Sequence, residues 1–140
     1  MQHKFLLNPS QENMDFILNG LVDFNQPFFP KLDNISFGCF LEDESGEIQG
    51  GATGSFILRT AHINYFWLSK NCRNKGLGTQ LIATIEQEAL SRHMISITLD
   101  TYSFQAPGFY EKQGFVCSGQ YRNSPVEGVN KLFYQKHLAY

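Results

Sequence analysis

The sequence has little cysteine, little charge and no long apolar run. Its three cysteines, Cys39, Cys72 and Cys117, are odd in number and form no CxxC pair, which argues against a disulfide framework or a thiolate metal site. No apolar run approaches the length of a membrane span, and the first residues lack the apolar stretch of a signal peptide. We therefore expect a cytoplasmic protein without a bound metal.

The charge and length of the chain exclude further classes of protein. Only 17% of the residues are charged and the formal net charge is −2, so the chain lacks the basic excess of proteins that coat nucleic acid or anionic membranes. With 140 residues, 42% of them hydrophobic, it is long enough for one core and too short for two. We expect a single domain over residues 1–140 that binds neither nucleic acid nor a membrane.

Acidic residues are absent from one long segment, residues 48–85. Buried strands exclude carboxylates, which accounts for residues 48–68 without any ligand. It does not account for Lys70, Arg73 and Lys75, which follow within a few positions. This cationic stretch indicates an anionic ligand.

The spacing of apolar residues predicts a mixture of strands and helices. The expected strands are residues 3–7, 35–41, 47–58, 61–68, 94–101, 115–121 and 131–138. One expected helix follows a Ser10 cap and ends before Pro27, and two more cover residues 75–92 and 105–113. The fold class is α/β, of the α+β kind: a mixed, largely antiparallel sheet of about six to seven strands with helices on both faces.

The segment RNKGLGT, residues 73–79, lies between an expected strand and the long helix. The first turn of a helix has amide N–H groups without internal partners and a partial positive charge, and glycines let a pyrophosphate approach the backbone. The segment lacks the GK[ST] of a Walker motif and the third glycine of a dinucleotide fingerprint. Either it binds a phosphate group or it is an ordinary turn from strand to helix.

Two motifs resemble the GNAT acetyltransferase superfamily. RNKGLG is similar to its R/Q-x-x-G-x-G/A loop, and FQAPGFYEKQGF, residues 104–115, is similar to its A-x-x-x-Y-x-x-x-GF segment. The motifs stand about 30 residues apart on the expected elements, which is more specific than either motif alone. The resemblance covers roughly residues 35–138 and implies the GNAT fold, with acetyl-CoA as co-substrate.

The resemblance also implies a binding mode. The strand at 64–68 should diverge from the one at 95–101, with the thioester arm of acetyl-CoA between them. The family often has Asn seven residues before the tyrosine, where this chain has Ser103, whose side chain is shorter, and Gln105 is the replacement. The remaining implied contacts are the main chain of Phe66 and Leu68 to the arm, and Arg73, Lys75, Gly76, Leu77, Gly78 and Thr79 to the pyrophosphate.

Two proton movements accompany attack of an amine on a thioester. Tyr110 stands at the family's tyrosine position, and full proton donation from a phenol to a thiolate is uphill by roughly 2 kcal/mol, so a hydrogen bond to the departing sulfur describes its role better. Neutralising an alkyl ammonium at pH 7 costs roughly 4.6 kcal/mol, which favours a base. His62 and Asp100 are the candidate bases, and solvent is the alternative.

The resemblance implies transfer of an acetyl group from acetyl-CoA to a primary amine of a small molecule or peptide, by direct attack in a ternary complex. The alternative is a non-catalytic acyl-CoA-binding sensor or regulatory module that uses the same loop. A nucleotide-phosphate binder is a weaker third interpretation. A homodimer formed through the last strands is compatible with each of them.

Overall fold

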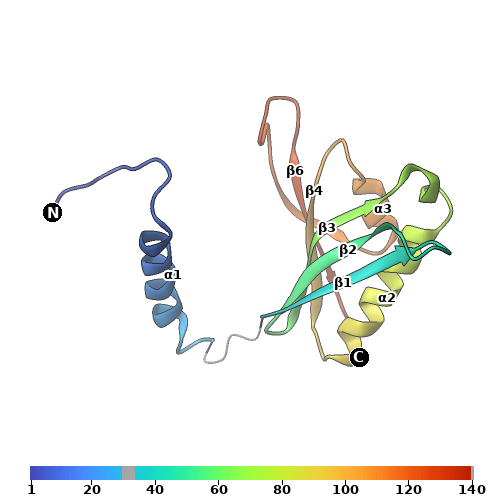
Figure 1. Ribbon diagram of the computed structural model, residues 1–140, viewed down its shortest axis with the longest axis horizontal. Helices are drawn as coiled ribbons and strands as arrows, with labels where there is room; N and C mark the ends of the chain where they lie inside the picture. The colour runs from blue at the N-terminus through green and yellow to red at the C-terminus, as the bar shows by residue number, and fades with distance from the viewer. Residues whose placement is uncertain (30–33, 140) are drawn as a thin grey trace. The chain divides into compact units, whose positions relative to one another are not determined.

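The structure, a computed structural model, describes residues 1–29 and 34–139 in two compact units, residues 1–32 and 33–140 (Figure 1). The first unit holds helix α1 (Gln11–Asn25), which begins after Ser10. The Ser10 hydroxyl accepts a hydrogen bond of 3.2 Å from the Asn13 N–H, as expected for a helix cap. Residues 3–7 form no strand, so that prediction is wrong. The segment is HKFLL, with only three apolar residues, and so short a segment forms a strand only where it finds a pairing edge.

The second unit contains a mixed sheet. All neighbouring strands are antiparallel except β3 and β4, which run parallel. The described residues form six strands, which confirms the predicted architecture. In spatial order they are β1 (Asn34–Glu42), β2 (Ile48–Ile57), β3 (Thr60–Leu68), β4 (Ser96–Tyr102), β6 (Lys131–His137) and β5 (Val116–Tyr121).

Helix α2 (Leu77–Ser91) lies along one face of this sheet (Figure 1). Its apolar face, which includes Ile82, Ile85 and Ala89, is buried in one core with Ile97 of β4. Each fully buried Ile contributes about 1.5–3 kcal/mol relative to an exposed one. Across residues 1–29 and 34–139, we find no helix that is both long and apolar enough to cross a membrane.

Strands β3 and β4 diverge along their length. The pairing register shifts between Thr53 and Gly54 of β2, which leaves Asn64 as an extra residue on β3. Such a bulge bends a strand and increases its twist. The β3–β4 pairing ends at Ile63, opposite Leu99, so beyond this point each strand has one edge without a strand partner among residues 1–29 and 34–139. The divergence confirms the expected opening and positions the site.

Candidate active site

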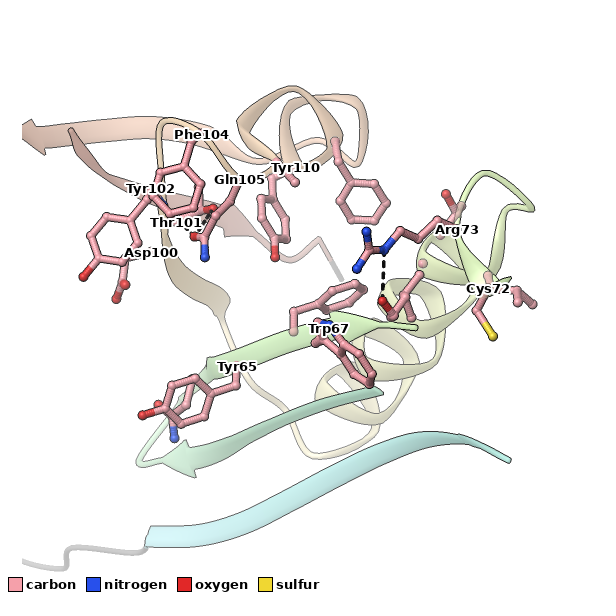
Figure 2. A pocket seen from close by; sticks show the side chains of 18 of the residues that line it. Tyr65, Trp67, Cys72, Arg73, Asp100, Thr101, Tyr102, Phe104, Gln105 and Tyr110 are labelled. Carbon is pink, nitrogen blue, oxygen red and sulfur yellow. Dashed lines mark hydrogen bonds between the residues drawn. The ribbon is translucent and has the colours of Figure 1, made fainter. Parts of the chain in front are cut away.

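A cavity of about 1470 Å³ lies between the diverging strands (Figure 2). It is larger than the roughly 300–1,000 Å³ of most small-molecule sites, so it has room for two substrates. The predicted catalytic residues Tyr110, His62 and Asp100 all line it. The predicted cofactor-binding residues that line it are Phe66, Leu68, Arg73, Gly76, Leu77, Gly78, Thr79 and Gln105.

The glycine loop forms one end of the cavity. A short 3-10 helix (Lys70–Cys72) leads into it, and Gly76 caps α2 with a φ of +76°. Within the part of the chain that the structure describes, no side chain caps the N-terminus of α2, and the first loop-to-helix hydrogen bond runs from Gln80 N to Gly76 O at 3.2 Å. The amides of the first turn are therefore available to an anion. The predicted order of loop and helix is confirmed, with the helix beginning at Leu77 rather than at residue 75.

Two cations of the loop have different positions. Arg73 lines the cavity, and its Nε donates a hydrogen bond of 3.1 Å to the Leu68 carbonyl at the end of β3. This contact orients the guanidinium and leaves its other N–H groups available. Lys75 does not line the cavity, and its contact with a pyrophosphate stays a prediction. Left-handed residues on both sides, Asn74 and Gly76, turn the chain there and give Lys75 an exposed position.

Helix α3 (Pro107–Lys112) carries Tyr110. The Tyr110 ring is buried among Phe66, Phe109, Phe115 and Tyr134, with ring centroids 5.2–6.3 Å away. Its hydroxyl points into the space between the two strands (Figure 2). Burial raises the pKa of Tyr110 to about 12, with a smaller contribution from the negative charge of Asp100. The phenol therefore remains a hydrogen-bond donor at all physiological pH values.

The two candidate bases lie on one face of the sheet. His62 of β3 is opposite Thr98 of β4, and its Nδ1 is 2.7 Å from the Thr98 hydroxyl. Asp100 is two residues further along β4, so its side chain is on the same face as Thr98. The Asp100 carboxylate has a cation nearby, with Lys131 Nζ 3.8 Å from Oδ1.

Ser103 does not line the cavity, so the contact that the resemblance implied for it is not supported. Its hydroxyl accepts a hydrogen bond of 3.0 Å from Asn130 N, and its own N–H donates to the Asn130 carbonyl at 2.9 Å. These bonds hold the end of β4 beside the start of β6. Gln105 does line the cavity, where its Oε1 accepts bonds from Thr101 Oγ1 and Tyr102 N, at 3.1 and 2.8 Å.

The Gln105 amide nitrogen and the Tyr110 hydroxyl both point into the cavity (Figure 2). The sequence reasoning missed other lining residues, among them Tyr102, Phe104 and Lys131. Period-two alternation from Asp100 would have found Tyr102, because alternate residues of a strand share a face. Lys131 had no such signal, since it reaches the site from β6 by long-range pairing.

The family model for the acetyltransferase (GNAT) family matches residues 11–115. Among known proteins, the chain is 37% identical over 96 residues to the blasticidin-S acetyltransferase of Streptomyces morookaense, covering 68% of this chain and 70% of that protein.

Solved structures of acetyltransferases resemble this chain as well. An acetyltransferase from Bacillus cereus ATCC 14579 superposes with a TM-score of 0.87 and 30% identity, covering 96% of this chain and 98% of that one. A protein assigned as a streptothricin acetyltransferase, from Bacillus anthracis str. Ames and solved in complex with acetyl coenzyme A, gives a TM-score of 0.62 and 26% identity, covering 78% and 65%. The chain belongs to the GNAT acetyltransferase family.

Proposed function

We propose that this chain transfers the acetyl group of acetyl-CoA to a primary amine of a small molecule, by direct attack in a ternary complex. The observation that carries this proposal is one cavity that joins the uncapped start of α2 to the Tyr110 hydroxyl. The relative solved with acetyl coenzyme A supports the donor. The relative named for blasticidin-S supports a small-molecule acceptor over a peptide.

The residues present fit the donor. A Cβ added at Gly76 would meet nothing within 4 Å, so the backbone there is open to a close ligand. The first-turn amides of α2, with Arg73 and the Thr79 hydroxyl, would hold the pyrophosphate. The unpaired edge of β3 at Phe66 and Leu68 would hold the pantetheine arm as an added strand. When bound, acetyl-CoA supplies the thioester that is attacked.

Tyr110 would act on the leaving sulfur. The amine nitrogen forms a bond to the carbonyl carbon, the carbon–sulfur bond breaks, and the sulfur leaves with the electron pair. With its pKa raised to about 12, against about 8.5 for a thiol, the phenol would lose about 5 kcal/mol by giving up its proton completely. Tyr110 therefore donates a hydrogen bond to the sulfur, and the coenzyme thiol takes its proton from solvent.

The acceptor amine must also lose a proton, and three groups could accept it. In the tautomer whose Nδ1–H donates to the Thr98 hydroxyl, His62 can accept a proton at Nε2. The Asp100 carboxylate is the second group able to do so, and both line the cavity with Tyr110. A water chain through the open cavity is the third route. A proton inventory on His62→Gln and Asp100→Asn variants separates these routes.

The test is release of coenzyme A thiol from acetyl-CoA in the presence of a panel of amines that includes blasticidin-S. We expect turnover with at least one amine and none without an amine. Acetyl-CoA binding measured by calorimetry without turnover on any amine would favour the sensor. Displacement of bound coenzyme A by equimolar ATP would favour the nucleotide-phosphate binder. The single domain over residues 1–140, the cytoplasmic location and the homodimer stay predictions.

A further inference from the structure

The cavity has two chemically different ends on either side of the Tyr110 hydroxyl. Arg73 and the glycine loop lie at one end, and Asp100, Tyr102 and Phe104 lie at the other (Figure 2). The first end suits the anionic part of the donor, as proposed above. The second end is therefore left for the acceptor amine, and its side chains define what kind of amine fits.

Aromatic side chains line both walls of this second end. Tyr65 and Trp67 on β3 are 78% and 59% exposed, and Phe104 after β4 is 71% exposed. Isolated exposed aromatics are common on protein surfaces, but several that line one cavity are typical of a ligand-binding groove. Tyr65 and Trp67 are two residues apart on one strand, so they share a face of the sheet, with Tyr65 on the Asp100 side of Tyr110 and Trp67 on the Arg73 side (Figure 2).

The opposite wall presents a flat surface. The rings of Tyr102 and Phe104 are nearly parallel, at an interplanar angle of 7° and a centroid distance of 5.9 Å. Aromatic rings prefer offset-stacked or edge-to-face partners, so a further planar ring can stack on this pair. These faces also attract a cation. The wall therefore favours a planar, positively charged ligand.

The charges of the cavity limit the acceptor further. Among the described residues that line the cavity, Asp100 is the only acidic one, whereas Arg73 and Lys131 are both cationic. The Asp100–Lys131 pair is loose at 3.8 Å and partly exposed, and pairs of this kind stabilise a protein little. The carboxylate can thus accept one ligand cation. Because Arg73 lies at the donor end, a polycation at the second end would meet the like charge of Lys131, with Asp100 as the single counter-charge.

We infer that the acceptor is a singly charged amine that bears a flat conjugated ring, with its ring against the aromatic walls and its amine beside Asp100. This inference rests on the proposed function, because it assigns the acceptor end of that same site. It excludes polyamines and polycationic amino sugars as preferred acceptors.

Trp67 is the single tryptophan of the chain and lines the same cavity two residues after Tyr65, so its fluorescence reports binding beside this wall without any turnover. The protein is saturated with coenzyme A and titrated with phenylethylamine, cyclohexylethylamine or spermidine. Calorimetry on the same samples detects any binding that leaves Trp67 emission unchanged. We expect phenylethylamine to bind roughly ten-fold more tightly than the saturated-ring analogue, and spermidine to bind more weakly than both.

Three variants, one of them a control, locate the binding of the ring and of the amine. Phe104→Leu should lower the affinity for phenylethylamine roughly five-fold, whereas Phe40→Leu, which changes an exposed aromatic outside the cavity lining, should not. Asp100→Asn should lower the affinity for phenylethylamine and for cyclohexylethylamine alike, by roughly ten-fold. Phe104 and Phe40 are exposed, so neither variant threatens folding.

Equal binding of the two ring amines, tighter binding of spermidine, or no binding of phenylethylamine would each overturn the inference. An Asp100→Asn variant with unchanged affinity would do so as well. Thiol release with the wide amine panel is measured separately. Turnover with other amines but no ring preference removes only this inference, whereas no turnover with any amine removes the proposed function.

Discussion

The side-chain amide of Gln113 donates a hydrogen bond of 3.0 Å to the hydroxyl of Thr79. Gln113 ends α3, the helix that carries Tyr110, and Thr79 is in the first turn of α2, which begins at the glycine loop. The bond therefore joins the element that would act on the sulfur to the element that would hold the pyrophosphate. The Thr79 hydroxyl accepts this bond, so its own proton remains free to donate to an anion.

Replacement of Tyr110 by Phe should separate catalysis from binding. The ring packing is retained and the hydroxyl, which points into the cavity, is lost. We expect the turnover number to fall at least roughly ten- to a hundred-fold, as for other losses of one transition-state hydrogen bond, while the dissociation constant of coenzyme A changes less than about two-fold. Thiol release and calorimetry measure the two quantities. Unchanged turnover would leave Tyr110 a packing residue.

A methyl group at Gly78 should disturb both ends of the donor site. A Cβ there would lie 3.2 Å from two ring carbons of Phe109, whose ring packs against Tyr110. Gly78→Ala should raise the dissociation constant of coenzyme A about ten-fold and also lower turnover. Gly108→Ala is the matched control, because a Cβ at Gly108 has open space.

The control variant should bind coenzyme A like the wild type and gain up to about 1 kcal/mol of unfolding free energy, since Ala favours a helix over Gly. If both alanine variants bound coenzyme A equally well, the first turn of α2 would not be the anion site.

The elements of this fold were predictable because their patterns are local. Alternation of apolar residues marked the strands, and the glycine motif together with the periodic helix after it marked the start of α2. Tyr110 was found by a motif, and the structure supplies the physical reason for its position, a buried ring with a hydroxyl at a cavity.

Long-range contacts were not predictable from such patterns. The periodicity of α2 places Glu86 and Glu88 on its outward side, yet Glu86 pairs with Lys136 of β6, fifty residues away in sequence. The Ser103 hydroxyl likewise accepts a hydrogen bond from the N–H of Asn130, which is distant in sequence. In both cases the partner is brought in by the β4–β6 pairing, which no local pattern in either segment encodes.

The unfolding free energy should depend on alkaline pH through Tyr110. Its pKa is raised to about 12 in the folded state, against about 10 for an ordinary tyrosine, mainly because the ring is buried. The protonated form is therefore favoured by folding. This stabilisation is complete below pH 10 and is lost as the pH rises through 12.

Urea unfolding of the wild type and of Tyr110→Phe between pH 8 and 11 measures this effect. The wild type should lose about 1 kcal/mol more than the variant by pH 11, because the variant has no phenol to ionise. The Tyr134 phenol, whose pKa burial also raises to about 12, is present in both proteins and cancels. Parallel curves would show that the Tyr110 hydroxyl is solvated.

Lys136 should be a larger source of stability than a surface ion pair. Its ammonium donates to the Glu86 carboxylate at 2.8 Å and to the Gln113 carbonyl at 2.9 Å, so it joins β6 to α2 and to the end of α3. Lys136→Met keeps most of the side-chain volume but leaves a half-buried carboxylate and a carbonyl without their donor. We expect a loss of about 1–3 kcal/mol in urea unfolding.

Glu88→Gln provides the comparison, because it breaks the exposed pair between Glu88 and Arg92, the C-cap of α2. Pairs of that kind contribute about 0.3–0.5 kcal/mol, so the control should differ little from the wild type. Glu86→Gln combined with Lys136→Met should recover part of the loss, because the carboxylate charge left without a partner is then removed as well. A loss equal to that of Glu88→Gln, or no recovery in the double variant, would mean that solvent replaces the ammonium at both contacts.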